Sequence, residues 1–523
     1  MYQTPFDKMD REPVDATAER PAPTLSATPT PDAIWPSSRP HRGLRGTLAE
    51  RWLFVGLCLV VIAALAMQFA VPIASLTRRI SMNNNEGWNA YWSTRVLAGL
   101  PLYTDPSSPI SNNYPPLSFY IVGLLGRAIG DTILAGRLLC LSALIAVAFM
   151  IERVVGWFGG ARQWSIAAAG IFLLLIAAVA PRYLAADDPQ WLAEALMTGS
   201  LLLLIGRMPS MPDDRRIVAA CLLMVLSGLI KHNQIALPIA TTLWLAWYDR
   251  HGLTIWLATA AVAGGIAVAA LAFLYGPAVF GEVLRHQRLI NPALIGDALH
   301  SLGFQLPELL VALALAWRRP RDPRITLLLL FAPLAIAIGI GERMGTGVSQ
   351  NAHFDSAIAL TILAGIALSR GVAGLRQISL RLAAFAVMIA PMTVKAAHHA
   401  PANLAQLAAI DRTDAQWRNA IAFLAAQTGP VACERTALCY WSGKPYALDV
   451  FNYGQKLHFG HDPIGLRERL AGREFAALVE VRSARDGEDD AHLPADFRKL
   501  IAANYRVDRI LSDQVYILVP RTS

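Results

Sequence analysis

Long apolar runs separated by short, arginine-bearing segments occupy most of the chain between about residue 52 and residue 397. Because roughly 20 apolar residues in a helix cross a bilayer, the pattern predicts an all-α polytopic membrane region of about eleven spans. The two runs beside Lys231 fit either two helices in a hairpin or one long broken element. The predicted spans lie near 52–76, 132–152, 163–180, 190–206, 217–230, 233–248, 253–275, 306–317, 325–341, 355–369 and 382–397.

The segments at the two ends of the chain are more polar. Residues 1–50, rich in Pro, Thr, Ala and Asp, are predicted to be a disordered cytoplasmic tail, and the first apolar run an uncleaved span. Residues 51–397 form the membrane domain, and residues 398–523 are predicted to form a separate extracytoplasmic α/β domain. Its expected strands are 430–434, 475–481 and 515–519, and its expected helices 417–427 and 497–504.

Arginines between the apolar runs set the expected orientation, since cytoplasmic loops carry an excess of Lys and Arg. Counted loop by loop, they place the N-terminus in the cytoplasm and the C-terminus outside, which agrees with an odd number of spans. The long loops 77–131 and 276–305 then share a face with the C-terminal domain. The cytoplasmic arginines are Arg39, Arg42, Arg45, Arg51, Arg153, Arg162, Arg207, Arg215, Arg216, Arg250, Arg318, Arg319, Arg321, Arg324, Arg370, Arg376 and Arg381.

Composition supports the membrane assignment. Of 523 residues, 54% are hydrophobic and 16% charged, against about 25% charged in soluble domains. The net charge of +8 does not indicate nucleic-acid binding, because no basic patch interleaved with aromatic residues is present. Cys433 and Cys439 lie in the domain placed outside, and the sequence leaves open whether they pair.

Four polar groups are expected at the outer membrane edge, where ionisable residues are costly and need a reason. Together they suit an anionic, lipid-linked substrate with a polar head. Taken singly, an Asp could cap the fourth helix, the lysine could reach the headgroups, and the arginines could face lipid phosphate. The groups are Asn85 with Glu86, Asp187 with Asp188, Lys231 with His232, and Arg285 with His286 and Arg288.

The segment from Asn83 to Gly130 carries a family resemblance. Its pattern is an acidic pair position (Asn85-Glu86), an aromatic helix, "LAG-P-Y", then "PPL" and an amphipathic helix. It resembles the first extracytoplasmic loop of membrane glycosyltransferases of the GT-C fold, the family with protein mannosyltransferases, aminoarabinose transferases and rhizobial lipopolysaccharide-core sugar transferases. Asp187, Asp188 and Lys231 also sit where this family places comparable residues.

The resemblance implies sugar transfer from a polyprenyl-phosphate donor to a hydroxyl of a glycan, lipid or protein acceptor. The setting would be the outer face of a bacterial inner membrane, among membrane lipids. A carboxylate would act as general base, and cations would stabilise the leaving phosphate. Glu86, Asp187 and Asp188 are the catalytic candidates. The substrate-binding candidates are Asn85, Trp88, Tyr91, Tyr114, Lys231, His232, Arg285 and His286.

Two positions depart from the family pattern. Asn85 replaces the expected catalytic Asp, and Asn113-Tyr114 replaces a Glu-Lys pair found in aminoarabinose transferases. The base would then be Glu86, Asp187 or Asp188, or the chemistry has been lost. We therefore expect no tightly bound metal, while a loosely held divalent cation stays open. The alternatives to a transferase are a lipid-linked sugar transporter and an inactive family member in envelope glycan assembly.

The predicted orientation can be tested with a cysteine placed at Ser523. A membrane-impermeant maleimide added outside the cell membrane should label it, because the C-terminal domain is expected there. Labelling only from the cytoplasmic side would contradict the topology.

Overall fold

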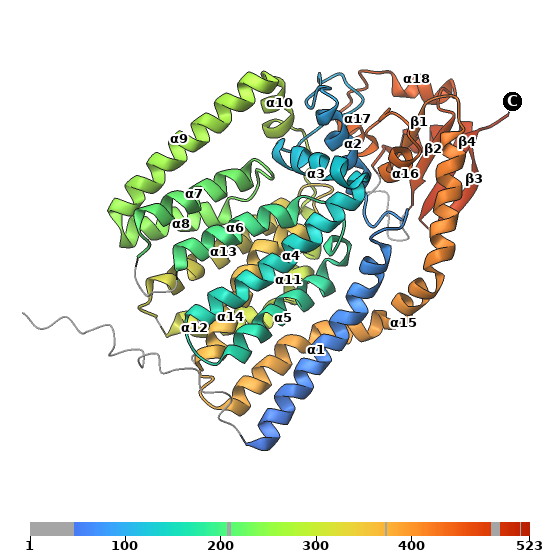
Figure 1. Cartoon of the computed structure of the whole chain (residues 1–523). Helices are drawn as coiled ribbons and strands as arrows, with labels where there is room; N and C mark the ends of the chain where they lie inside the picture. The colour runs from blue at the N-terminus through green and yellow to red at the C-terminus, as the bar shows by residue number, and fades with distance from the viewer. Residues whose placement is uncertain are drawn as a thin grey trace, which may run out of the picture. The chain divides into compact units, whose positions relative to one another are not determined.

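Every predicted span coincides with one helix in the computed structural model of the chain (Figure 1). The model describes residues 47–206, 211–318, 320–371, 374–482, 492–512 and 514–522, which fall in a single unit spanning His41–Ser523. The two runs beside Lys231 form two separate helices. The helices are α1 (Leu48–Ser75), α4 (Thr132–Trp157), α5 (Arg162–Val179), α6 (Gln190–Ile205), α7 (Asp214–Gly228), α8 (Ala236–Tyr248), α9 (Arg250–Tyr275), α12 (Leu306–Trp317), α13 (Pro323–Arg343), α14 (Phe354–Arg370) and α15 (Ile378–Ala425).

The number of helices able to cross a bilayer alone is smaller than the predicted number of spans. In the described ranges, seven helices are long and apolar enough, or eight if the bent pair Pro292–Gly303 and Leu306–Trp317 is one span. The prediction of about eleven is not confirmed. Helix α8 has 13 residues; at about 1.5 Å per residue it cannot cross a 30 Å hydrocarbon core alone.

The helices differ in how much of their surface is buried by the rest of the protein. Almost all of α14 is buried inside the bundle, whereas the apolar window of α9 is not buried at all. Phe273 of α9 is 89% exposed, as expected for a lipid-facing surface. Helix α1 begins at Leu48, where Thr47 and Glu50 form a capping box, so residues 48–50 of the predicted tail are helical; the rest of that prediction, residues 1–46, lies outside the described residues.

The connecting segments contain short helices, of which α2, α3 and α10 lie at the same end of the bundle as the C-terminal sheet (Figure 1). This arrangement agrees with the prediction that loops 77–131 and 276–305 share a face with the C-terminal residues. The orientation of the chain in the membrane stays a prediction. Five of the arginines counted for it lie outside the described residues: Arg39, Arg42, Arg45, Arg207 and Arg319. The elements are α2 (Asn85–Leu97), α3 (Leu117–Ile129), η2 (Pro181–Tyr183), α10 (Ala278–Leu284), η3 (Pro292–Leu294), α11 (Ile295–Gly303) and η4 (Gln350–His353).

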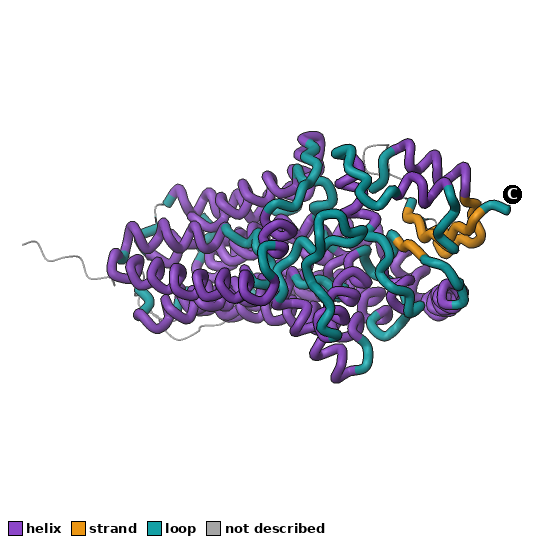
Figure 2. The backbone as a smooth tube through the Cα atoms, turned by 90° about the horizontal axis from the view of Figure 1, so that it is seen from above, coloured by secondary structure: helices purple, strands orange, loops and turns teal. Residues whose placement is uncertain are grey.

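A small four-stranded sheet lies near the C-terminus (Figure 2). Its order is β1-β2-β4-β3; β1 and β2 are parallel, and β4 pairs antiparallel with both neighbours. The three predicted strands are confirmed, and β3 is additional. The strands are β1 (Val431–Cys433), β2 (Ala477–Val481), β3 (Tyr505–Ser512) and β4 (Val515–Pro520), and the helices around them are α16 (Thr436–Trp441), α17 (Val450–His458), α18 (Leu466–Ala471) and α19 (Ala495–Asn504).

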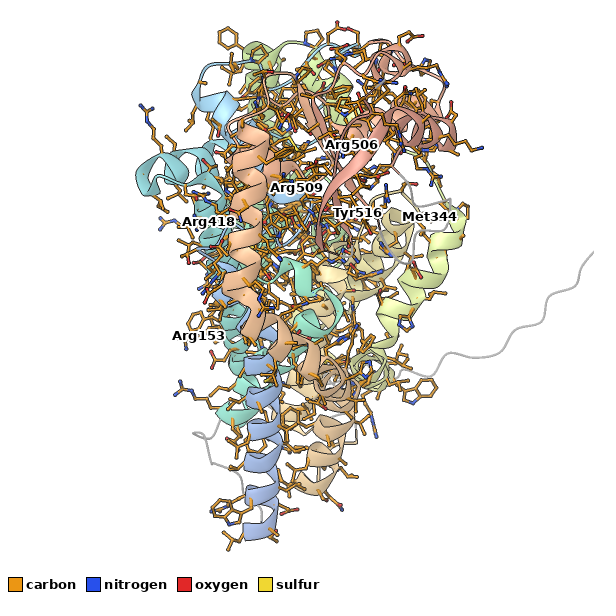
Figure 3. The ribbon with its side chains drawn as sticks, turned by 90° about the vertical axis from the view of Figure 1, so that its right-hand side faces the viewer. Arg153, Met344, Arg418, Arg506, Arg509 and Tyr516 are labelled. Atoms are coloured by element: carbon orange, nitrogen blue, oxygen red, sulfur yellow. A yellow bond between two sulfur atoms is a disulfide. The ribbon has the colours of Figure 1, made fainter. Side chains whose placement is uncertain are left out.

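Helix α15 connects the membrane region to this sheet without a break. The domain boundary predicted at residue 397 falls inside it, so that division stays a prediction. Figure 3 shows Arg509 of β3 beside the part of α15 that carries Arg418, and the Arg509 guanidinium lies 3.8 Å from the Phe423 ring centroid. A disulfide joins Cys433 to Cys439, which settles the alternative left open by the sequence.

Helix α2, which is part of the first loop, packs against the region around the C-terminal sheet. Gly87 permits the contact, because a side chain there would overlap the backbone of α16. Tyr91 stacks on Tyr446 with ring centroids 4.7 Å apart. Trp88 Nε1 donates to Asp449 Oδ2 at 3.1 Å.

Glu282 of α10 connects the 276–305 loop to the first loop through hydrogen bonds. Its carboxylate accepts hydrogen bonds from Thr104 Oγ1 at 2.9 Å and from Asn112 N at 2.7 Å. Burial raises the pKa of Glu282 to about 7, although these hydrogen bonds act in the opposite direction. When the pKa of an acid is higher in the folded protein than in the unfolded chain, the folded protein loses stability as pH rises from the unfolded pKa to the folded pKa.

We therefore expect the parent protein to lose stability relative to Glu282→Gln between about pH 4.5 and pH 7. Above that window the difference between them should stay constant. Melting temperatures of both proteins across this range measure the effect, and the comparison cancels other titrating groups. A difference that does not change with pH would contradict the assignment.

Candidate functional site

A buried ion pair joins the start of α2 to α4. Arg137 Nε lies 2.7 Å from Glu86 Oε1, and Arg137 Nη2 lies 3.0 Å from Glu86 Oε2. The exposed side-chain fractions are 1% for Arg137 and 0% for Glu86. Glu86 also accepts hydrogen bonds from Met82 N at 2.8 Å and Asp187 N at 3.3 Å. Both carboxylate oxygens are thus held by one buried guanidinium group, and this two-point ion pair does not favour the expected role of Glu86 as general base.

Arg137 also organises the chain between α1 and α2. Its guanidinium donates to the carbonyl oxygens of Ser75, Leu76, Arg78 and Ile80, at distances between 2.6 and 3.0 Å. These carbonyls follow the end of α1, where helical hydrogen bonding stops. Arg137 was not among the predicted site residues, although an arginine inside an apolar run is itself a signal.

Asp187 and Asp188 lie in the turn before α6, and Asp187 points into the protein. Its carboxyl packs against α4 at Gly136, where any side chain would overlap it. Asp187 Oδ2 is buried without a hydrogen-bond partner among the described residues. Burial, followed by the charges of Glu86 and Asp188, raises the pKa of Asp187 well above its ordinary value. Burial therefore favours the neutral form of this carboxyl group.

Asp188 faces Asn85 and Lys231. Asn85 Nδ2 donates to Asp188 Oδ2 at 3.0 Å, and Lys231 Nζ lies 3.9 Å from Asp188 Oδ1. Gln190 N donates to Asp188 Oδ1 at 2.9 Å, so Asp188 also supports the start of α6. The structure thus brings together three of the four predicted groups: the Asn85–Glu86 pair, the Asp187–Asp188 turn and Lys231.

Lys231 lies between α7 and α8 and is 4% exposed, so it does not reach toward headgroups. Its Nζ is 5.0 Å from the Tyr114 ring centroid. Burial acts to lower the pKa of Lys231, but Tyr114 and Asp188 outweigh burial and the pKa is raised. Lys231 is therefore a cation near neutral pH, with Tyr114 and Asp188 on either side.

Two histidines and Arg288 adjoin Lys231, from the next position in the sequence and from the 276–305 loop. Burial lowers the pKa of His232, and the charges of Lys231 and Arg288 add to this effect. Burial and then Arg288 lower the pKa of His286 to about 4. Arg285 is exposed, and no contact in the described part of the chain joins it to the others. Arg288, noted in the loop sequence but not chosen as a site residue, therefore takes the place expected for Arg285.

The aromatic residues expected to face a sugar are covered by protein. Trp88 is 8% exposed and makes edge contacts with Tyr114 and Phe119 at 5.1 and 5.7 Å. Tyr91 is 7% exposed and stacked on Tyr446. This burial does not favour sugar stacking by Trp88 or Tyr91. Tyr114 remains next to Lys231 and keeps its expected position in the site.

A polar network continues from Asp188 into the helices. Asn351 lies 3.0 Å from Gln190 Oε1 and 3.2 Å from Lys231 Nζ, and Gln190 Nε2 donates to Glu194 Oε1 at 2.8 Å. Asp355 adjoins this network beside a cavity of about 10 Å³, the size of one water. Gln190, Glu194 and Asp355 were missed because they were counted as parts of spans, where acids are a functional signal, and Asn351 lies in a loop from which no site residue was predicted.

The donor set around Asp188 does not fit a divalent cation. Both carboxylate oxygens meet hydrogen-bond donors or an ammonium group, where a cation would need oxygen ligands. Within the described ranges, no group of three or more His, Cys, Asp or Glu residues is placed to hold a metal ion. The loosely held cation stays a prediction.

A larger cavity of about 650 Å³ adjoins this cluster. Asn84 lies in its wall, immediately before Asn85, and so do Arg182, Arg343 and Ser349 from the loops around η2 and η4. The opposite wall comes from β1, β2 and α17. Neither Asp188 nor Lys231 is among the described residues that line it.

The fold is that of GT-C glycosyltransferases, as the sequence resemblance predicted. ArnT from Cupriavidus metallidurans, in a crystal structure bound to undecaprenyl phosphate, matches with a TM-score of 0.53 and 14% identity, over 91% of this chain and 99% of ArnT. The Archaeoglobus fulgidus oligosaccharyltransferase in its apo form matches with a TM-score of 0.50 and 12% identity, over 89% and 74% of the two chains. The sequence matches no protein-family model and no curated protein.

Removing the Arg137 side chain should destabilise the protein, because Glu86 would remain buried and unpaired. We expect Arg137→Met to cost about 3–5 kcal/mol. Thermal unfolding of the purified protein measures the loss, with Arg127→Met, an exposed arginine of α3, as control. The double variant Glu86→Gln/Arg137→Met should recover part of the stability. Equal melting temperatures for Arg137→Met and the control would contradict the proposed importance of the pair.

Proposed function

We propose that this protein is a membrane glycosyltransferase that moves a sugar from a polyprenyl-phosphate donor to a hydroxyl of a glycan, lipid or protein acceptor. The observation that carries the proposal is the Asp188–Lys231 pair, 3.9 Å apart, at the loop end of a GT-C fold. A carboxylate and a cation side by side supply the two groups that this reaction needs. ArnT, which shares the fold, is described with undecaprenyl phosphate bound.

Asp188 is the proposed general base. Of the three predicted carboxylates, Glu86 is occupied by Arg137, and Asp187 is buried with a raised pKa. Asn85, at the position of the family's acid, donates to Asp188 and orients it. The catalytic carboxyl would thus come from the turn before α6 instead of from α2.

Lys231 and Arg288 are the proposed phosphate contacts. Tyr114 and Glu342 each interact electrostatically with both cations, and the Tyr114 ring lies 5.0 Å from Lys231 Nζ. His232 and His286 lie beside this pair with lowered pKa values, so they are neutral near pH 7. They can donate or accept hydrogen bonds to a sugar or phosphate without adding charge.

In the proposed reaction the acceptor oxygen attacks the anomeric carbon as its proton passes to Asp188. The bond from the anomeric carbon to the phosphate oxygen breaks, and polyprenyl phosphate leaves with the bonding electron pair. Lys231 and Arg288 stabilise the negative charge that grows on the phosphate. Glu86 acts as a positioning residue, because its ion pair fixes α2 and thereby Asn85.

One observation favours a second candidate, an inactive family member in envelope glycan assembly. The expected catalytic position is Asn85, and the neighbouring Glu86 is occupied by an arginine. Under this candidate Asp188 would only support α6. We place the transferase in a bacterial inner membrane with the N-terminus cytoplasmic and the C-terminal sheet periplasmic, in line with the arginine distribution.

The deciding experiment assays purified protein with a panel of polyprenyl-phosphate sugars. Asp188→Asn should lower the transfer rate by about 10²–10⁴, the usual contribution of a general base. Asp105→Asn, an exposed acid in the first loop, is the matched control. If the parent transfers a sugar and Asp188→Asn keeps its rate, Asp188 is not the base; a parent inactive on every donor would favour the inactive candidate.

Asp187→Asn should behave differently from Asp188→Asn. Since burial raises the pKa of Asp187 and so favours its neutral form, an amide of the same shape should retain the rate within about tenfold. The ratio of the two variant rates at pH 7 measures this contrast. If Asp187→Asn lost more of the transfer rate than Asp188→Asn, Asp187 and not Asp188 would be the general base.

A further inference from the structure

The cavity of about 650 Å³ beside the proposed active site is rich in arginine. Among the described residues that line it are five arginines and three acids. Its apolar wall includes Leu448, Phe451 and Leu478 from the C-terminal region. The charged residues are Arg182, Arg343, Arg435, Arg482, Arg498, Asp297, Glu434 and Glu480.

Much of the negative charge in this cavity is already paired. Glu480 lies 2.6 Å from Arg482, and Glu434 lies 2.5 Å from His492. Arg182, Arg435 and Arg498 form no ion pair with a described residue. Nε of Arg435 and Nε of Arg498 are buried donors without a hydrogen-bond partner in the described part of the chain.

The arrangement of Arg182 and Arg435 is unfavourable for the protein alone. Burial, followed by the charge of Arg182, lowers the pKa of Arg435 to about 10. The buried, unpartnered donor of Arg435 beside a second guanidinium group costs free energy unless an anion accepts from it. Phosphate and carboxylate oxygens match the planar fork of arginine.

The cavity also adjoins the reaction site. Asn84 lies in its wall, and the next residue, Asn85, donates to Asp188. Ser349 lies in the wall two residues before Asn351, which is 3.2 Å from Lys231 Nζ. A molecule in the cavity would therefore lie within a few residues of the proposed base.

We propose that this cavity binds an anionic group of the acceptor, a phosphate or an acidic sugar, through Arg182, Arg435 and Arg498. The assignment to the acceptor rests on the proposed function, because it places the acceptor hydroxyl near Asp188. The anion site itself rests on the arginines alone. The acceptor class is therefore a negatively charged glycan or glycolipid.

The test measures anion binding by the purified full-length protein in detergent, without any sugar donor. Inorganic pyrophosphate should raise the melting temperature of the parent in a saturable way. The variant Arg182→Gln/Arg435→Gln should weaken the apparent affinity by about tenfold or more. Arg506→Gln on β3, an exposed arginine labelled in Figure 3 and not among the residues lining the cavity, is the matched control.

A second arm replaces pyrophosphate with galacturonate, which separates a phosphorylated acceptor from an acidic sugar. If the double variant fails to fold, Arg498→Gln from another wall of the cavity tests the same site. No saturable binding of either anion, or equal affinity in the parent and the cavity variants, would overturn the proposal. No sugar is transferred in this experiment. Its result therefore does not depend on whether the transferase assay succeeds, and the two proposals can fail separately.

Discussion

The buried pair of Glu86 and Arg137 is the interaction on which the site depends. Two charges removed from water are tolerated only when good geometry and further hydrogen bonds offset their desolvation. Here the remaining donors of Arg137 reach carbonyls at the end of α1, and the remaining capacity of Glu86 is used by backbone N–H groups. The pair therefore sets where α1 ends, where α2 begins and where the Asp187 turn lies.

Around this pair, three carboxyl groups close in space are held in different states. Glu86 is held in an ion pair, the pKa of Asp187 is raised by burial, and Asp188 faces a lysine. Three charged carboxylates at such distances would repel one another strongly in a low dielectric. The environment of each group thus decides which one is available for proton transfer, and the replacement of an acid by Asn85 reduces the repulsion further.

The sequence predicted the helices, three of the four strands and the gathering of polar residues at one end, because hydrophobic periodicity and chain polarity are local signals. It did not predict β3, an edge strand that carries the charged residues Arg506, Asp508 and Arg509, as is common at the edges of sheets. It also missed the partner of Glu86, since Arg137 is 51 residues away inside an apolar run. The covered faces of Trp88 and Tyr91 depend on packing against Tyr114 and Tyr446, which no local pattern encodes.

Helix α15 has 48 residues and passes from the bundle into the core of the C-terminal sheet. Its contour length is about 72 Å, more than twice the thickness of a bilayer core. Because Trp417 and Leu424 of the same helix pack against the strands, a change in the tilt of its apolar part, or in its bend near Pro391 and Pro401, would displace the sheet and the arginine-bearing wall beside it. The shape of the cavity would then depend on the thickness of the surrounding bilayer, and therefore on its lipid composition.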